Sequence, residues 1–260
     1  MELKNIKPVF IIGTGHSGTS ILYKMLAMHP DFAWFSQYSC RGGEIPGRLK
    51  LPFYKYFNRI LRLFFKHNWL KKEGRTKIIP RPGEAGKIWD YVLPRDENVL
   101  SDKIADRLKV ILNSECANWH KDRILLKSIR FHSYLPILKR AFPQAKFIHI
   151  VRDGRAMALS RVKYLQKAKE WKKAVEEINQ ERENLDFFEL RYEDFCDDVK
   201  GHLKKILNFV GLDEAKFSVN KFPGVLTSKN SQWLQEANAD KIRQIEDIQR
   251  EMLKKYGYIQ

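Results

Sequence analysis

Short apolar runs alternate with longer amphipathic stretches along the chain, and this alternation predicts an α/β fold. The first run, PVFIIG at 8–13, is rich in β-branched and aromatic residues and ends in glycine, as expected for a buried strand. The stretch SGTSILYKMLAMHP at 17–30 has a helical period instead. Its apolar positions are Ile21, Leu22, Met25 and Leu26, its start signals are Ser17 and Thr19, and its stop signal is Pro30.

The second half of the chain repeats this order of strand and helix. Apolar runs predict strands at 123–129, 145–153 and 186–195. Amphipathic periods predict helices at 134–142, 154–185 and 197–211, and a closing helix within 231–258. Strands that alternate with helices favour a mainly parallel central sheet covered by helices on both faces. The sequence therefore predicts a single α/β domain over residues 1–260.

The region 42–122 interrupts the alternation, and we interpret it as a mostly helical insert. Its apolar residues at helical spacing are Phe53, Phe57, Ile60, Leu61 and Phe64. One interpretation is a helix that packs on the sheet and exposes a basic face to solvent. The other is a helix that lies on an anionic membrane or recognises an anionic or lipid substrate.

Composition adds a strong positive charge to this picture. The 260 residues include 48 Lys and Arg against 31 Asp and Glu, a formal net charge of +17, so the long-range field attracts anions. Much of the excess lies between Arg48 and Arg81, where Glu73 is the only acidic residue. Charge alone does not distinguish nucleic acid, an anionic membrane and a phosphorylated small molecule.

Cysteine usage and the N-terminal sequence indicate a cytoplasmic protein. Cys40, Cys116 and Cys196 are widely spaced and odd in number, which favours reduced thiols over a disulfide framework or a zinc site. The first apolar run is too short for a signal peptide, and no run reaches the roughly eighteen apolar residues of a membrane span. Attachment to a membrane surface stays open.

The stretch FIIGTGHSGTSIL, at 10–22, has the glycine spacing of a phosphate-binding loop between a strand and a helix. Glycines let backbone N–H groups approach an anion, and hydroxyl side chains add donors. The glycines are Gly13, Gly15 and Gly18, and the hydroxyl residues are Ser17, Thr19 and Ser20. A nucleoside triphosphatase needs a lysine at the position of Thr19. The sequence therefore predicts a phosphate cradle and disfavours nucleoside triphosphate hydrolysis.

A second candidate for anion binding ends the strand at 145–153. Arg152 lies there, and an arginine at this end of a strand offers a planar fork of donors where α/β sheets bind their ligands. Ser160 follows two helical turns later and is expected on the same side. The alternative for Arg152 is a salt bridge to the adjacent Asp153 or to another neighbouring residue.

Together these motifs resemble those of the sulfotransferases that use 3′-phosphoadenosine 5′-phosphosulfate (PAPS). GHSGTS is similar to the family's 5′-phosphosulfate loop, and FIHIVRDGRAMALS is similar to its 3′-phosphate segment. RYEDF resembles the family's segment near the adenine, and SKNSQW echoes a C-terminal element that contacts the 3′-phosphate. The resemblance implies that the donor is bound by Gly15, His16, Ser17, Gly18, Thr19, Ser20, Arg152, Ser160, Tyr192 and Lys229. It points to the bacterial-type, tyrosylprotein or carbohydrate branches and leaves most of 42–122 unexplained.

The same resemblance implies transfer of a sulfuryl group from PAPS to a hydroxyl or amine, without a metal ion. The family usually has lysine or arginine at the position of His16. We hypothesise that His16 stabilises the leaving group and that Lys127 supplies a permanent positive charge. The alternative is that His16 only forms hydrogen bonds within the loop.

The catalytic base has two candidates from the resemblance. Glu44, in CRGGEIPG, fits the branches that use a glutamate some tens of residues beyond the loop, and we place it first. His132, in KSIRFHSYLP, roughly fits the branch that uses a histidine after the middle strand. The alternative for Glu44 is a surface carboxylate in a turn.

The sequence is compatible with two other functions. One is a nucleotide-dependent kinase or hydrolase on a phosphate-loop fold, and the other is a non-enzymatic protein that binds polyanions. No nucleic-acid-binding motif accompanies the charge, so nucleic acid is not expected as a partner. We expect a small-molecule, lipid or carbohydrate acceptor shaped by the insert at 42–122, and the sequence does not predict an oligomeric state.

Overall fold

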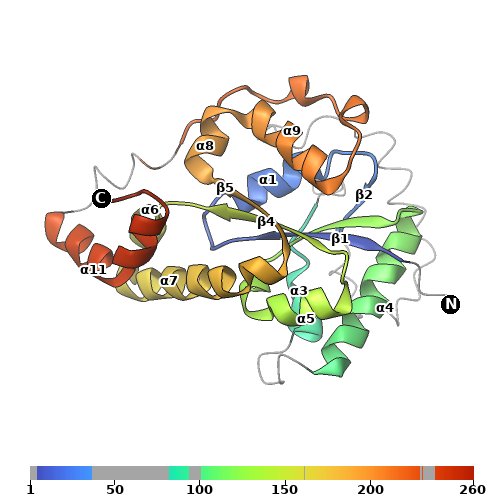
Figure 1. Ribbon diagram of the computed structural model, residues 1–260, viewed down its shortest axis with the longest axis horizontal. Coiled ribbons are helices and arrows are strands. Elements are labelled where there is room, and N and C mark those ends of the chain that lie inside the picture. Colours follow the sequence, from blue (N-terminus) through green and yellow to red (C-terminus); the bar gives the residue numbers. More distant parts are fainter. Residues whose placement is uncertain (1–4, 37–81, 94–100, 161, 229, 231–237) are drawn as a thin grey trace.

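A five-stranded parallel sheet lies at the centre of the molecule, in the order β2-β3-β1-β4-β5 (Figure 1). The structure is a computed structural model, and it describes residues 5–36, 82–93, 101–160, 162–228, 230 and 238–260. The strands are β1 (Lys7–Ile12), β2 (Phe32–Ala33), β3 (Arg123–Lys127), β4 (Lys146–Val151) and β5 (Asp186–Arg191). All described strand pairs within this sheet are parallel, which confirms the predicted fold class.

Helices cover both faces of the sheet, as predicted (Figure 1). Their bounds are α1 (Thr19–Leu26), α3 (Gly86–Val92), α4 (Asp102–Trp119), α5 (Leu135–Ala141), α6 (Gly154–Leu159), α7 (Tyr164–Glu181), α8 (Tyr192–Asp197), α9 (Val199–Val210) and α11 (Ala239–Lys255). Short 3-10 helices are η1 (Phe131–Tyr134), η2 (Arg182–Asn184), η3 (Glu214–Lys216) and η4 (Val219–Lys221).

Strand β1 divides the interior into two cores because its side chains alternate between the faces of the sheet. Phe10 and Ile12 pack into a core with residues of α3, α4 and α5, whereas Val9 and Ile11 pack with residues of α1, α8 and α9. All four side chains are buried, so β1 is covered on both faces. Figure 1 shows α1, α8 and α9 on one side of the sheet and α3, α5 and α7 on the other.

The register of the strands brings the loops that follow them to one edge. Ile11 of β1 pairs with Lys127, the last residue of β3, and Ile12 pairs with His149 of β4. Because the strands are parallel, the loop after β1 lies between the ends of β3 and β4. This edge is where open α/β sheets bind their ligands.

Two predicted boundaries are wrong. The strand predicted at 186–195 ends at Arg191, and Tyr192 begins α8, because its ring packs against the loop after β1 rather than continuing the ladder. The helix predicted at 154–185 is broken between α6 and α7. A straight helix would separate Gly154 from Trp171 by about 26 Å. Instead, the Trp171 indole packs at Gly154, and its Nε1 donates to the carbonyl of Arg152 (3.1 Å), so the chain turns back.

Parts of the insert and of the closing helix lie outside the described residues. Helices α3 and α4 lie within the range 42–122, and the helix expected around Phe57 falls in the undescribed range 37–81. The closing helix is described from its cap, Asn238, whose side chain accepts from the N–H of Lys241. None of the helices within the described ranges has both the length and the apolar composition needed to cross a bilayer.

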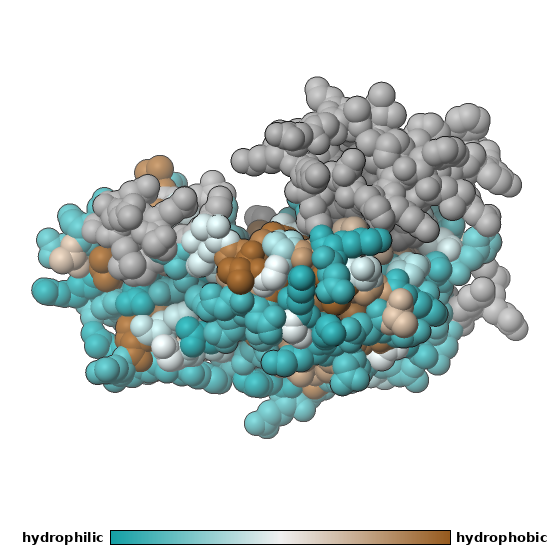
Figure 2. All heavy atoms as spheres, turned by 90° about the horizontal axis from the view of Figure 1, so that it is seen from above, coloured by the Kyte–Doolittle hydropathy of each residue, from teal (hydrophilic) through white to brown (hydrophobic). Residues whose placement is uncertain are grey.

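The visible surface is largely hydrophilic (Figure 2). A small group of apolar atoms gathers between the two grey regions of that view. Large apolar side chains exposed among the described residues are Tyr91, Val110, Ile129, Val162, Leu165 and Val225. Ile129 lies two residues after the end of β3 and thus beside the ligand edge of the sheet.

We expect Gly154→Ala to destabilise the protein by about 1–3 kcal/mol, because an added methyl group overpacks a buried site. A Cβ at Gly154 would lie 2.7 Å from Cδ2 of the buried Trp171 and would also meet the Gln249 side chain. Gly86→Ala is the matched control, since nothing lies within 4 Å of a Cβ there. Urea unfolding of both variants measures the difference, and equal stabilities would contradict the packing at Gly154.

Candidate active site

The loop between β1 and α1 has the backbone shape of an anion cradle. Gly13 and Gly18 have φ angles of 149° and 92°, and His16 also has a left-handed φ of 63°. A Cβ at Gly18 would lie 2.6 Å from Cδ2 of Tyr192, so only glycine fits there. The Ser17 hydroxyl donates to the carbonyl of Thr14 at 2.7 Å and closes the loop.

The start of α1 differs in detail from the prediction. Gly18 is the N-cap and has no side chain that could accept from the helix. Thr19 is the first helical residue. Ser17 therefore shapes the loop instead of capping α1. The helix start is left to bind an anion through its backbone N–H groups, while the Ser20 side chain is exposed at the same end.

Arg152 joins this loop to the end of β4. The residue is 7 % exposed, and its guanidinium donates from Nη1 to the carbonyl of His16 at 2.7 Å and from Nε to Oδ1 of Asn230 at 2.7 Å. It also stacks 4.7 Å from the centre of the Tyr192 ring. The structure thus brings Arg152, Tyr192 and the loop together.

Asp153 forms its ion pair with Arg155 rather than with Arg152. Asp153 caps α6 by accepting from the N–H of Arg155 at 2.9 Å, and its carboxylate also pairs with the Arg155 guanidinium at 2.9 Å. Arg155 reaches Glu246 of α11 at 2.6 Å. Burial alone would lower the pKa of Arg155, but Asp153 and Glu246 raise it above its ordinary value. The turn that carries Arg152 is fixed by these charges.

The structure describes Ser160 but not the other two candidate residues, Lys229 and Glu44. Ser160 is exposed at the end of α6, where its hydroxyl donates to the carbonyl of Met157 at 2.7 Å. Lys229 and the candidate base Glu44 lie outside the described residues. Their roles stay predictions.

Lys127, at the end of β3, reaches the loop from the opposite side. Its side chain is 3 % exposed, and its Nζ lies 3.2 Å from the hydroxyl of Ser20 and in direct contact with the Glu84 carboxylate. Burial lowers the pKa of Lys127 below its ordinary value, although Glu84 acts in the opposite direction. The positive charge expected at Lys127 therefore depends on its acidic neighbour.

Glu84 is a site residue that the sequence reasoning missed. It follows an isolated bridge between Ser36 and Pro82, and the N–H of Gly83 donates to the carbonyl of Phe35 at 2.9 Å. These contacts hold the segment beside the loop. The signal was present in PRPGEAG, which has the same glycine–glutamate pattern as the CRGGEIPG segment chosen for Glu44.

A cavity of about 410 Å³ opens beside the loop, and both candidate histidines line it. Its lining residues are Thr14, Gly15, His16, Ile129, His132, Met157, Lys167, Glu170, Trp171 and Ala174. Nδ1 of His132 lies 2.6 Å from Oε2 of Glu177, which fixes the ring. Because Nδ1 faces this carboxylate, Nε2 is the nitrogen suited to accept a proton.

A larger cavity of about 480 Å³ lies at the amino-terminal edge of the sheet, where Arg123 begins β3. Several of its charged side chains are engaged in structural contacts. Lys216 pairs with Asp31 at 3.2 Å, and the Arg123 guanidinium donates to the carbonyl of Val210. We therefore assign the chemistry to the smaller cavity, which borders the loop.

Comparison with known proteins agrees with this geometry. The sequence profile of the sulfotransferase family matches residues 8–216. Protein-tyrosine sulfotransferase 1 of Danio rerio is 33 % identical over 161 residues, which are 61 % of this chain and 36 % of that protein. The Mycobacterium bovis omega-hydroxy-beta-dihydromenaquinone-9 sulfotransferase Stf3 is 26 % identical over 252 residues, covering 80 % of this chain and 63 % of that protein.

Solved structures share the fold. The crystal structure of sulfotransferase STF9 from Mycobacterium avium superposes with a TM-score of 0.64 at 14 % identity, and the match covers 96 % of this chain and 77 % of that one. The chain spans about a third of the length of the tyrosine sulfotransferase and less than two thirds of Stf3.

Removing the partner of Lys127 should leave a buried, unpaired charge. We expect Glu84→Gln to destabilise the protein at pH 7 by about 1–3 kcal/mol, a moderate value because Glu84 is half exposed. Without the carboxylate the pKa of Lys127 falls further below its ordinary value. The loss in free energy of unfolding relative to the wild type is therefore largest at neutral pH. It disappears as the pH rises toward the ordinary lysine pKa of about 10.4, where Lys127 loses its charge.

Urea unfolding of both proteins at pH 7 and pH 10 measures this change. Asp90→Asn is the control, because it breaks an ion pair to Arg130 (2.8 Å) in which the Asp90 side chain is 73 % exposed. The control should show little loss at either pH. A pH-independent deficit in Glu84→Gln would contradict the pairing with Lys127.

Proposed function

Because the chain belongs to the sulfotransferase family, we propose that it transfers a sulfuryl group from PAPS to a hydroxyl acceptor at the loop between β1 and α1. The observation that carries this proposal is the buried Arg152, which joins that loop to a second anion site at the end of β4. A donor with phosphates at both its 5′ and 3′ positions requires two such sites. Family membership favours this function over a nucleotide-dependent kinase and over a non-enzymatic polyanion-binding protein.

The donor is assigned residue by residue. The loop from Gly15 to Ser20 holds the 5′-phosphosulfate through backbone N–H groups and hydroxyls. Arg152 binds the 3′-phosphate, and two of its contacts are already made to His16 and Asn230. A guanidinium has five N–H donors, so further donors are available for an anion. Tyr192 lies under Arg152 on the adenine side. Ser160 and Lys229 complete the 3′-phosphate site in this proposal.

In the transfer step, the bond from sulfur to the 5′-phosphate oxygen breaks and a bond from sulfur to the acceptor oxygen forms. PAP leaves with the extra negative charge, and the acceptor loses a proton to a base. Lys127 contacts the loop at Ser20, His16 belongs to the loop itself, and both stabilise the charge on the leaving oxygen. Lys127 is held in this role by its contacts to Glu84 and Ser20.

Two described residues can accept the acceptor's proton. Glu84 is favoured because its carboxylate lies 3.4 Å from the Ser20 hydroxyl at the end of the loop and is half exposed to an incoming acceptor. His132 is the second candidate, because Glu177 orients its ring toward the cavity shared with His16. Glu44 remains a candidate outside the described residues.

The acceptor in this proposal is a molecule whose hydroxyl group is attached to a larger organic group. The names of the two relatives indicate a protein tyrosine in one and a hydroxylated menaquinone in the other. The cavity beside the loop has apolar walls from Ile129 and Met157 and polar groups from His16 and His132. It suits an apolar group with one polar end, which agrees with the lipid or small-molecule acceptor expected from sequence.

Ligand-dependent thermal unfolding tests the donor. PAP at about 100 times its dissociation constant should stabilise the protein by about 2.7 kcal/mol, whereas ATP with Mg²⁺ should have little effect. Arg152→Ala should lose most of the stabilisation by PAP. Arg140→Ala serves as the control, because Arg140 makes an exposed pair with Asp102, of which 90 % of the side chain is exposed. Equal stabilisation by PAP and ATP would overturn the proposed donor.

Transfer of labelled sulfate from PAPS tests the base. The acceptors are 4-nitrophenol, a tyrosine peptide and a long-chain primary alcohol. Glu84→Gln should lower the turnover of whichever acceptor reacts by about 10²–10⁴-fold, the typical contribution of a general base, with PAP affinity retained. Glu170→Gln is the control, because it removes a different carboxylate, one that lines the cavity beside the loop. Full turnover in Glu84→Gln with a large loss in His132→Gln would transfer the role to His132.

A further inference from the structure

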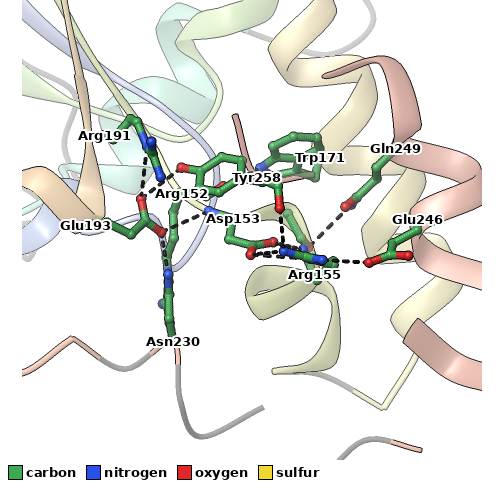
Figure 3. Close-up of polar contacts among 11 residues, drawn as sticks. Arg152, Asp153, Arg155, Trp171, Arg191, Glu193, Asn230, Glu246, Gln249 and Tyr258 are labelled. Atoms are coloured by element: carbon green, nitrogen blue, oxygen red, sulfur yellow. Dashed lines mark hydrogen bonds and ion pairs between the residues drawn. The ribbon is translucent and has the colours of Figure 1, made fainter. Parts of the chain in front are cut away.

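A chain of polar contacts leads from the C-terminal residues to Arg152 (Figure 3). Tyr258 OH donates to Oε2 of Glu193 at 2.8 Å, and Oε1 of Glu193 accepts from Nδ2 of Asn230. Oδ1 of Asn230 in turn accepts from Nε of Arg152 at 2.7 Å. We call the four residues Tyr258, Glu193, Asn230 and Arg152 the C-terminal relay.

Glu193 decides how the Asn230 amide is oriented. A carboxylate is only an acceptor, so it takes the NH₂ end of the amide and turns the oxygen end toward Arg152. That oxygen then fixes the Nε side of the guanidinium. A neutral amide at position 193 could donate as well as accept, so the Asn230 amide would be oriented by the donor-only Nε of Arg152 alone.

Glu193 is itself held by four groups. Besides Tyr258 and Asn230, the backbone N–H of Asp153 donates to it at 3.3 Å, and Nε of Arg191 lies 4.0 Å from its Oε2. Glu193 thus contacts the residue next to Arg152. Burial, and then the charge of Glu193, raise the pKa of Tyr258 above its ordinary value. Tyr258 therefore stays protonated and acts as a donor. Its ring also lies 4.7 Å below the Arg191 guanidinium, which keeps it in place.

From these contacts we propose that Glu193 is a positioning residue for the 3′-phosphate of the donor, acting on Arg152 through Asn230 and oriented by Tyr258. The inference rests on the proposed function, because Arg152 is the group that binds the 3′-phosphate there. Asn230 and Tyr258 lie beyond residue 216, where the match to the family profile ends. Two of the four relay residues therefore lie outside the part of the chain that the family profile matches.

The test compares two nucleotides that differ only in the 3′-phosphate. Isothermal titration measures the affinity of the full chain for PAP and for adenosine 5′-monophosphate. In Glu193→Gln the affinity for PAP should fall by about tenfold, the value of one hydrogen bond to a charged group, while the affinity for adenosine 5′-monophosphate should stay within about twofold. A purely structural role would weaken both ligands alike.

Two C-terminal tyrosines provide a matched pair of variants. Tyr258→Phe removes the hydroxyl that orients Glu193 and should weaken PAP by about threefold to fivefold. Tyr256→Phe removes a similar bond, from Tyr256 OH to Oε2 of Glu189 at 3.0 Å, which does not belong to the relay. It should leave the affinities for both nucleotides unchanged.

The outcomes separate the inference from the function on which it rests. If Glu193→Gln binds PAP as tightly as the wild type, or loses affinity equally for both nucleotides, the positioning role is wrong. If the wild-type protein does not distinguish PAP from adenosine 5′-monophosphate, the proposed donor itself is wrong. A selective loss for PAP in Glu193→Gln and Tyr258→Phe, but not in Tyr256→Phe, supports the relay.

Discussion

A buried cation must be paired, and this constraint organises the ligand edge of the sheet. Lys127, Arg152 and Arg155 are all largely removed from water there, and each is held by oxygen atoms from other parts of the chain. The partners come from the loop after β1, from the segment at Glu84 and from α11. The pairing that makes burial tolerable also determines where each cation lies. Positive charge is thus ready in fixed places before any anion arrives.

The two helical layers serve this edge in different ways. Helix α1 presents its amino terminus through the glycine loop, and α8 supplies the aromatic ring on which the loop and Arg152 rest. On the other side, α7 supplies Trp171, whose indole supports the carbonyl of Arg152, and Glu177, which orients His132. Helix α11 locks the turn after β4 through Glu246. The fold therefore supports the site from elements separated by most of the chain length.

Local patterns predicted the parts of the site that are continuous in sequence. The strand–glycine loop–helix unit and Arg152 were recognisable because glycine spacing and a strand end carry their own signals. Glu177 and Asn230 could not be predicted in this way, since each acts through a contact with a residue at least 37 positions away. The error at Tyr192 has the same origin, because a tertiary contact with Gly18 overrides strand propensity. Sequence patterns indicate where an anion binds, while long-range pairing decides how the binding groups are held.

The hydrogen bond from Arg152 to the carbonyl of His16 has one further consequence. It makes the two anion sites a single rigid unit, so on the proposed assignment a ligand is recognised by the separation between its two charged ends. Binding one end then presents the other at a high effective concentration, as in a bivalent ligand with a short linker. A molecule carrying only one of the two anionic groups forfeits this advantage, whatever the strength of that single contact. On this assignment the protein would discriminate among nucleotides by the distance between their two anionic groups.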